Sequence, residues 1–271
     1  MSYQRKQKSV QDQIRSGRIS VRQVETKNQK PKKKTSFREY TEAILVALLA
    51  AMFLRAFVVQ AFRIPTGSMK DTLLVGDFLL VNKFIYGVRT PDRIPIFDAH
   101  IPFNNPPLRL PAFKQPQNGD VVVFKYPENP RLDYIKRCIA VGGQTVEVRN
   151  GEVFVDGKPE GKHTPLWRRY DSDDGQEFEY TRIDAPNGKS YTIRHLVGGY
   201  SKTENFGPVT VPAGNYFMMG DNRDNSADSR SWGLLPEESV VGEALIIYFS
   251  WHQGEDLLNL IRWTRIANWI R

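Results

Sequence analysis

About 20 consecutive residues near the N-terminus, residues 43–62, are almost entirely apolar, and any fold of this chain must accommodate them. As a helix they would be about 30 Å long, which matches the hydrocarbon thickness of a bilayer. Arg55 interrupts the run, and an arginine there can extend toward the membrane surface or face protein. The pattern therefore favours one transmembrane helix over residues 37–62.

Two other interpretations of this run stay open. In a cleaved signal peptide, residues 59–61 would provide the cleavage site. The 42 residues before the run are long for the charged start of a signal peptide, however, and Arg55 breaks the apolar part. The third interpretation is a helix buried in a protein core.

The basic charge of the chain lies in front of the apolar run. Residues 1–42 contain 12 Lys and Arg and 4 acidic residues, which equals the whole net charge of +8. Residues 1–36 contain too little apolar surface to fold, so we expect a disordered basic tail. The positive-inside rule places this tail in the cytoplasm and the rest of the chain beyond the membrane. Because the remainder is neutral overall, we expect no nucleic-acid binding.

The remaining composition limits the chemistry of the chain. Hydrophobic residues make up 40% and charged residues 25%, which is typical of a globular protein. The single cysteine, Cys138, excludes a disulfide within the chain and a cysteine-rich zinc site. The four histidines lack metal-ligand spacing, so we expect neither a metal nor a cofactor.

After residue 62 the pattern indicates a mainly β protein. Gly, Pro or Asp bounds a series of short β-branched and aromatic runs, which predict strands at residues 77–88, 120–126, 145–149, 152–155, 191–194, 208–211, 216–219 and 240–249. Asn150-Gly151 predicts a tight hairpin turn, and Asp156-Gly157 predicts a second turn. No segment between residues 63 and 255 has a helical period.

Three segments depart from this strand pattern. Residues 91–116 are rich in proline, which predicts an irregular surface loop. Residues 160–207 are more polar and weakly patterned, which indicates a lobe inserted into a β domain of residues 63–255. Residues 256–271 are amphipathic and contain tryptophan, so they either lie at a membrane interface or dock on their own domain.

Ser68 is a candidate nucleophile. Pro65 and Gly67 allow a sharp turn that raises the Ser68 hydroxyl from the sheet and leaves backbone N–H groups available for an oxyanion. A turn with a purely structural role has the same pattern. Lys70 is one possible base, but side chains two residues apart on a strand point in parallel rather than toward each other.

Lys136 is the stronger candidate base. In a strand over residues 132–140, one face would carry Tyr134, Lys136, Cys138 and Ala140. Burial on such an apolar face lowers the pKa of a lysine from its ordinary value of about 10.4. A lysine whose ammonium group reaches solvent would fit the same pattern.

A third cluster, residues 219–233, combines arginines and aspartates. Counted from Asp221 as a calcium-binding EF-hand loop, it fails because Arg223 and Trp232 stand where oxygen ligands are required. A loop stabilised by its own ion pairs fits better.

These three clusters, in this order behind an apolar segment, resemble the bacterial type I signal (leader) peptidases. The resemblance extends from about residue 58 to residue 250 and depends on four motifs: Ile64-Pro-Thr-Gly-Ser-Met69, Gly119-Asp-Val-Val-Val-Phe-Lys-Tyr-Pro127, Asp133-Tyr-Ile-Lys-Arg137 and Gly220-Asp-Asn-Arg-Asp-Asn-Ser-Ala-Asp-Ser-Arg230. It implies coiled antiparallel β-sheets with an inserted lobe, preceded by one N-terminal transmembrane helix. It also implies a serine endopeptidase of the bacterial cytoplasmic membrane, with the catalytic domain on the outer side. Its partners would be the lipid bilayer and secretory preproteins, whose signal peptides it removes after small residues at −3 and −1.

The resemblance also assigns roles by position. Ser68 would be the nucleophile and Lys136 the neutral general base, and the Ser68 N–H and Thr66 hydroxyl would form the oxyanion hole. Orienting or structural roles would fall to Ser226, Asp221, Asp228 and Arg230. The pockets for small side chains would be lined by Ile64, Pro65, Met69, Leu73, Leu79, Val123, Asp133, Tyr134 and Ile135. Unlike some members, this chain has one apparent membrane segment and no cysteine pair in the inserted region.

A membrane-anchored binding module without peptidase activity is the alternative function class. It would use an edge strand to pair with an extended peptide. A non-catalytic relative should have lost Ser68 or Lys136, and this chain has both.

Overall fold

The computed structural model describes residue 12 and residues 36–87, 93–94, 99–100, 111–198, 204–252 and 260–270. The chain divides into two units, residues 1–51 and residues 52–271. The expected disordered tail, residues 1–36, lies outside the described residues except for its residues 12 and 36.

Helix α3 (Ser36–Phe57) covers most of the apolar run. Large apolar side chains are exposed on several sides of it: Ile44, Leu45, Val46, Leu48, Leu49, Phe53 and Leu54. Within the described residues, no helix combines the length and the apolar character needed to cross a membrane.

The predicted helix over residues 37–62 is wrong at its C-terminal end. Helix α3 stops at Phe57, and residues 59–63 form strand β1 (Val59–Arg63). This strand pairs antiparallel with β2 (Asp77–Asn82), so that Val59 lies opposite Asn82 and Arg63 lies opposite Phe78. Hydrogen bonds to β2 satisfy the backbone groups of residues 59–63. No pattern within the apolar run could indicate this pairing.

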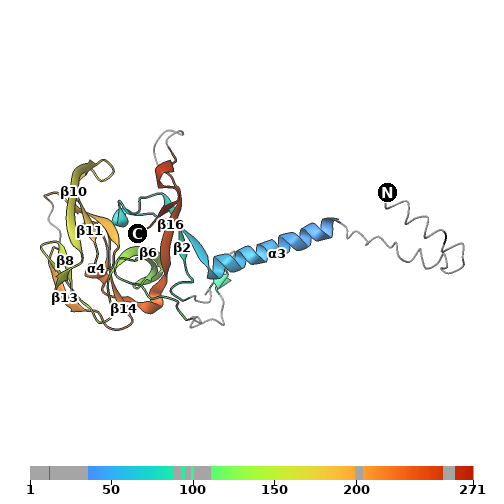
Figure 1. Ribbon diagram of the computed structural model, residues 1–271, viewed down its shortest axis with the longest axis horizontal. Helices are drawn as coiled ribbons and strands as arrows, with labels where there is room; N and C mark the ends of the chain where they lie inside the picture. The colour runs from blue at the N-terminus through green and yellow to red at the C-terminus, as the bar shows by residue number, and fades with distance from the viewer. Residues whose placement is uncertain are drawn as a thin grey trace. The chain divides into compact units, whose positions relative to one another are not determined.

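The body is mainly β, as expected, and the strands in its described residues pair antiparallel. The largest sheet has 8 strands in the order β1-β2-β16-β5-β6-β14-β15, with β17 beside β16 (Figure 1). Its further strands are β5 (Val121–Tyr126), β6 (Asn129–Val141), β14 (Asn215–Met219), β15 (Leu235–Pro236), β16 (Val240–Ser250) and β17 (Asn268–Trp269). Both faces of β5 are buried, because Val121 and Val123 pack in one core cluster and Val122 and Phe124 in another.

Smaller sheets complete the body. A four-stranded sheet contains β13 (Phe206–Thr210), β7 (Thr145–Arg149), β8 (Glu152–Val155) and β9 (Lys158–Pro159). A three-stranded sheet contains β10 (Lys162–Asp171), β11 (Gln176–Asp184) and β12 (Ser190–Leu196). Both predicted turns are confirmed: Asn150-Gly151 joins β7 to β8 and Asp156-Gly157 joins β8 to β9, with positive φ at all four residues. Figure 1 shows β8, β10 and β13 on one side of the body and β2 and β16 on the other.

Several expectations differ from the structure in detail. The strand expected over residues 77–88 ends at Asn82, after which the chain turns. Residues 160–207 contain β10 and β11, which the polar pattern did not predict because β10 is an edge strand with mostly exposed side chains. The short helix α4 (Ser229–Trp232) lies where no helix was expected. Strands β3 (Arg93–Ile94) and β4 (Ala99–His100) pair within the expected loop of residues 91–116, most of which lies outside the described residues.

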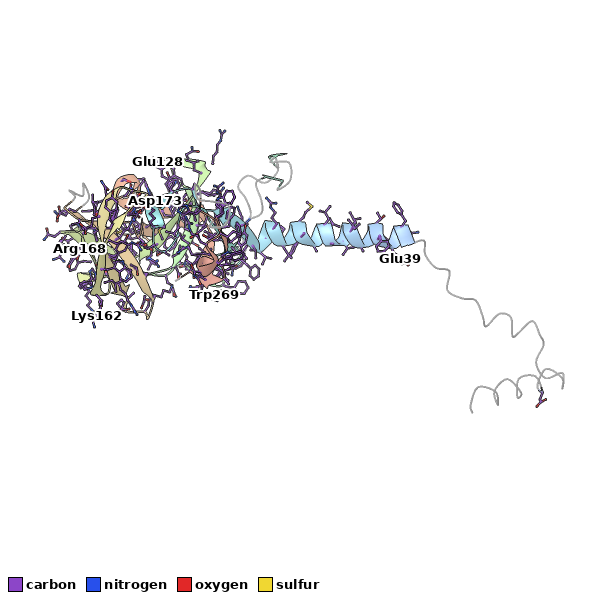
Figure 2. The ribbon with its side chains drawn as sticks, turned by 90° about the horizontal axis from the view of Figure 1, so that it is seen from above. Glu39, Glu128, Lys162, Arg168, Asp173 and Trp269 are labelled. Carbon is purple, nitrogen blue, oxygen red and sulfur yellow. The ribbon has the colours of Figure 1, made fainter. Side chains whose placement is uncertain are left out.

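The described C-terminal residues, 260–270, dock on their own domain. Strand β17 pairs with β16, and Ile261 forms a bridge to Trp251. Arg265 binds the buried Asp77 carboxylate with its Nη2 at 2.6 Å. Trp263 and Trp269 nevertheless remain exposed, and Figure 2 shows Trp269 at the surface. Of the two open interpretations of this segment, docking is therefore the one observed.

Candidate active site

The turn that carries Ser68 follows directly after β1. Residues Gly67–Met69 form a single 3-10 turn, closed by a hydrogen bond of 3.0 Å from the Lys70 N–H to the Gly67 carbonyl. Met69 is fully buried in the core below, so the turn has a fixed base. Thr66, just before the turn, has extended backbone angles and an exposed side chain. Ser68 is thus held at the rim of the core with its hydroxyl available for chemistry.

Lys136 reaches Ser68 from the middle of strand β6. Its Nζ lies 2.7 Å from Ser68 Oγ and 3.0 Å from the Ile135 carbonyl oxygen. Lys136 is only 4% exposed. Burial lowers the pKa of Lys136 to about 8, although the negative charges of Asp228 and Asp221 oppose this shift. The arrangement provides a serine hydroxyl hydrogen-bonded to a lysine that is partly neutral near physiological pH.

Lys70, the rival base, points elsewhere. Its ammonium group binds Asp171 and Asp174, each at 3.0 Å. Burial pulls the pKa of Lys70 down, but the hydrogen bonds and charges of these two carboxylates outweigh burial and raise that pKa above its ordinary value. Lys70 therefore stays charged, which disqualifies it as a proton acceptor.

Two buried ion pairs lie around the site, and one differs from the expected loop with its own ion pairs: Asp228 pairs within residues 219–233, but Asp221 pairs with Arg137 of β6. Asp221 binds Arg137, a fully buried residue, with 2.6 Å between Nη2 and Oδ2. Asp228 binds Arg230 at 2.8 Å and also accepts a hydrogen bond of 3.2 Å from the Gly220 N–H. These pairs fix the backbone of residues 220–230 next to the Ser68 turn.

Asn222 connects this loop to the nucleophile turn directly, a contact that sequence reasoning missed. Its backbone N–H donates to the Ser68 carbonyl at 3.1 Å, and its Nδ2 donates to the Gly67 carbonyl at 3.1 Å. Gly220 leaves no room for a side chain there, because a Cβ atom would collide with the Ser68 carbonyl and the Ser226 hydroxyl. Arg137 was missed as well; only its position beside Lys136 in a charged strand hinted at a role.

Ser226 lies close to these groups but differs from expectation in its contacts. Its Oγ is buried and has no hydrogen-bond partner among the described residues. The expected hydrogen bond that would orient Lys136 is therefore not formed in this structure, where Lys136 Nζ contacts Ser68 and the Ile135 carbonyl instead.

Most of the expected pocket residues cluster beside the dyad. One core cluster unites Ile64, Met69, Leu73, Leu79 and Val123, with Ile135 packed against it. Met69, Leu73 and Leu79 have no exposed surface, so they belong to the core and do not themselves present a surface to a substrate. Pro65 and Asp133 are exposed, and Asp133 forms an ion pair with Lys125 at 2.9 Å. Tyr134 is half-buried, and the Lys136 ammonium lies 5.3 Å from the centre of its ring.

The chain is similar in sequence to signal peptidases of several bacteria. The model of the family "Signal peptidase, peptidase S26" matches residues 37–251. Signal peptidase I of Pseudomonas aeruginosa is 36% identical over 84% of this chain and 78% of its own length. Signal peptidase I of Aquifex aeolicus is 35% identical over 79% of this chain and 84% of its own length.

A crystal structure of a signal peptidase I from Enterococcus faecalis is 30% identical, covers 48% of this chain and 97% of its own, and has a TM-score of 0.29. The family match extends over most of the chain, from helix α3 to the end of β16, and includes both Ser68 and Lys136. Because of that match, and of the two relatives that are 36% and 35% identical over their aligned residues, the chain belongs to the S26 family of signal peptidases.

Proposed function

We propose that this chain is the endopeptidase that removes N-terminal signal peptides from exported preproteins, with Ser68 as nucleophile and Lys136 as general base. The observation that carries the proposal is the 2.7 Å contact between Lys136 Nζ and Ser68 Oγ in a buried site. The substrate class is supported by the names of the relatives, which are signal peptidases I.

In this mechanism the Ser68 oxygen attacks the carbonyl carbon after the −1 residue while neutral Lys136 accepts the hydroxyl proton. The Ser68 N–H and the Thr66 hydroxyl stabilise the oxyanion of the tetrahedral intermediate. The Lys136 ammonium then donates its proton to the leaving amine, which breaks the peptide bond and leaves an acyl-enzyme. Water, deprotonated by Lys136, hydrolyses the ester and restores Ser68.

Burial of Lys136 is the energetic basis of this scheme. A lysine of pKa about 10.4 is neutral in only about 4 of 10,000 molecules at pH 7. With the pKa of Lys136 lowered to about 8, about one molecule in ten has a neutral base at pH 7. The lowered pKa corresponds to about 3 kcal/mol of destabilisation of the ammonium relative to the amine. Burial of the Lys136 side chain supplies that destabilisation.

We assign Ser226 the role of accepting a hydrogen bond from the Lys136 ammonium once the proton has moved. Its buried hydroxyl without a described partner supports this role, because protonated Lys136 has more donors than Ser68 and the Ile135 carbonyl can accept. Asp221, Asp228 and Arg230 would hold the loop that carries Ser226.

We assign selectivity for small side chains at −1 and −3 to the apolar residues that pack near the Ser68 turn. Ile64 and Val123 are nearly fully buried and Ile135 is half-buried, in a cluster closed from behind by Leu79. We expect a surface built of such packed, branched side chains to accept Ala at −1 and −3 better than a large side chain.

We further propose that the enzyme is attached to the bacterial cytoplasmic membrane, with residues 1–36 in the cytoplasm and the catalytic body outside. The support is the apolar run of residues 43–62, the exposed apolar side chains of helix α3, and the 12 Lys and Arg that precede them. A membrane position would raise the local concentration of substrates whose signal helices lie in the same bilayer. Protease added to right-side-out vesicles should digest the body and spare the tail.

The decisive experiment incubates the purified full chain in detergent with a preprotein whose signal ends in Ala-x-Ala. Sequencing of the new N-terminus should place the cut directly after the second Ala. Ser68→Ala and Lys136→Met should lose activity by more than about 10³-fold while keeping the thermal unfolding temperature of the wild type. Binding of the preprotein without cleavage by the wild type would instead indicate the non-catalytic binding module.

A further inference from the structure

Lys70 is a buried cation that the dyad mechanism does not use, although it lies only two residues after Ser68. Its side chain is 7% exposed, and its Nζ lies 3.0 Å from Asp171 and Asp174 and 3.4 Å from Asp173. All three aspartates lie at the tip of the hairpin formed by β10 and β11. A contact that spans 101 residues of sequence therefore joins the inserted lobe to the nucleophile turn.

The stem of Lys70 lies against that turn. Its Cδ is 3.4 Å from the position that a Cβ atom on Gly67 would occupy, so the side chain runs past the turn in van der Waals contact. The backbone N–H of Lys70 closes the turn through its bond to the Gly67 carbonyl. A force that fixes the Lys70 ammonium therefore also fixes the backbone of residues 67–70.

Arg194 binds the same hairpin tip and leads to the nucleophile by a second route. Its fully buried guanidinium contacts Asp171 at 2.7 Å and Asp174 at 2.6 Å. Its backbone N–H donates to the Asp221 carbonyl at 2.9 Å, and its carbonyl accepts from the Arg223 N–H at 3.1 Å. Between these two residues lies Asn222, whose hydrogen bonds hold the carbonyls of Gly67 and Ser68.

The two routes converge on residues 67–70, which form the nucleophile turn. Lys70 holds the C-terminal end of the turn, and Asn222 holds the carbonyls of Gly67 and Ser68. Both depend on the carboxylates of Asp171 and Asp174, which two buried cations share. Buried, charge-assisted hydrogen bonds of this kind have strict geometry, which makes them suited to fixing a reacting atom.

We propose that the tip of the β10–β11 hairpin, residues 171–174, positions the Ser68 turn through Lys70, so that the inserted lobe sets the geometry of the nucleophile. Lys70 is then a positioning residue for the reaction and not its base. The inference rests on the proposed role of Ser68 as nucleophile.

The test measures kcat, KM and the pH profile of preprotein cleavage by the full chain and its variants. Lys70→Met keeps the apolar stem but removes the charge, and it should lower kcat about 10- to 100-fold with KM within about twofold of wild type. Lys70→Arg keeps the charge and should recover most of the loss. Asp171→Asn removes a carboxylate that both Lys70 and Arg194 bind, so it should lower kcat at least as much as Lys70→Met. The double variant should be no worse than Asp171→Asn alone, because both changes act through the same hairpin tip.

Two further readouts separate positioning from folding and from base catalysis. The pH midpoint of kcat/KM should be the same in Lys70→Met as in the wild type, because the base is Lys136. Amide hydrogen exchange of residues 67–70, followed by mass spectrometry, should become faster in Lys70→Met and in Asp171→Asn. Arg168→Met is the matched control: it removes an exposed cation of the same hairpin, paired with Glu179 and lying at the outer edge of the body (Figure 2), and kcat should stay unchanged.

The possible outcomes are distinguishable. A wild-type chain that fails to cut the preprotein would overturn the proposed function itself. If the wild type cuts and Lys70→Met retains kcat within about twofold, or if Lys70→Arg is as poor as Lys70→Met, the positioning role is refuted. If the pH dependence of kcat/KM with its wild-type midpoint disappears in Lys70→Met, Lys70 is the base. That result would also refute the positioning role.

Discussion

Breaking the buried pair of Arg137 and Asp221 from one side should strongly destabilise the fold, and Asp221→Asn is the change that tests this. Arg137 is fully buried and binds Asp221 through two parallel hydrogen bonds, Nε to Oδ1 at 2.8 Å and Nη2 to Oδ2 at 2.6 Å. Asparagine has nearly the same shape, but it removes the negative charge and directs an NH₂ group toward the guanidinium or toward the Thr72 hydroxyl, which now donates to Asp221. The buried Arg137 charge would then lose the carboxylate that binds it through two hydrogen bonds.

The expected cost is about 3–5 kcal/mol, the usual penalty for breaking a buried ion pair from one side. For a folded body the size of residues 52–271, each kcal/mol changes the unfolding temperature by about 2–4 °C. Asp221→Asn should therefore lower the unfolding temperature by about 6–20 °C. Because the charge of Asp221 raises the pKa of Lys136, the same change should also shift the acid side of the pH–activity profile to lower pH.

Differential scanning calorimetry of the full chain in detergent measures the first effect. Glu179→Gln is the control, because it makes the same acid-to-amide change in an exposed pair with Arg168 and should change the unfolding temperature by no more than about 1 °C. If Asp221→Asn unfolds within about 2 °C of the wild type, the stabilising role assigned to the buried pair is incorrect.

Three further predictions concern the site. Cleavage should become about tenfold faster from pH 6 to pH 7 and level off above about pH 8, because activity requires neutral Lys136; a flat pH–rate profile would contradict this. Ser226→Ala should lower kcat about tenfold without lowering the unfolding temperature, since its hydroxyl has no described partner to lose; an unchanged kcat would remove its orienting role. Because burial raises the pKa of the Cys138 thiol, maleimide should neither label the native chain nor inhibit it, and mass spectrometry would detect the opposite result.

Local chemistry explains what the sequence predicted well. The hairpin at Asn150-Gly151 depends on two adjacent residues that tolerate positive φ, so neighbours in sequence contain all the information. Strand alternation predicted a buried Lys136, and Lys136 is buried, but residues 136–140 of β6 are all buried, and Ala140 packs with Ile139 in a different cluster from Cys138. The mainly β character of the body followed from the strand pattern, whereas the antiparallel arrangement was an expectation from the family resemblance.

Contacts between distant segments could not be predicted in this way. The end of helix α3 is set by the pairing of β1 with β2, and the apolar run itself continues past that end. Lys70 is fixed by aspartates about a hundred residues away, and neither partner has a distinctive sequence context. Asn222 stands inside a recognised motif, yet its hydrogen bonds to the Ser68 turn depend on how two loops meet.

Direct titration of the Lys136 side chain decides whether the site contains a neutral base. Lysine labelled with ¹³C and ¹⁵N in the full chain gives an NMR signal for each side chain, and the Lys136 signal is identified by its loss in Lys136→Met. We predict a titration midpoint of about 8 for the pKa of Lys136. A midpoint near the ordinary lysine value of 10.5 would contradict the proposed mechanism, because such a lysine stays protonated and cannot accept the proton of Ser68.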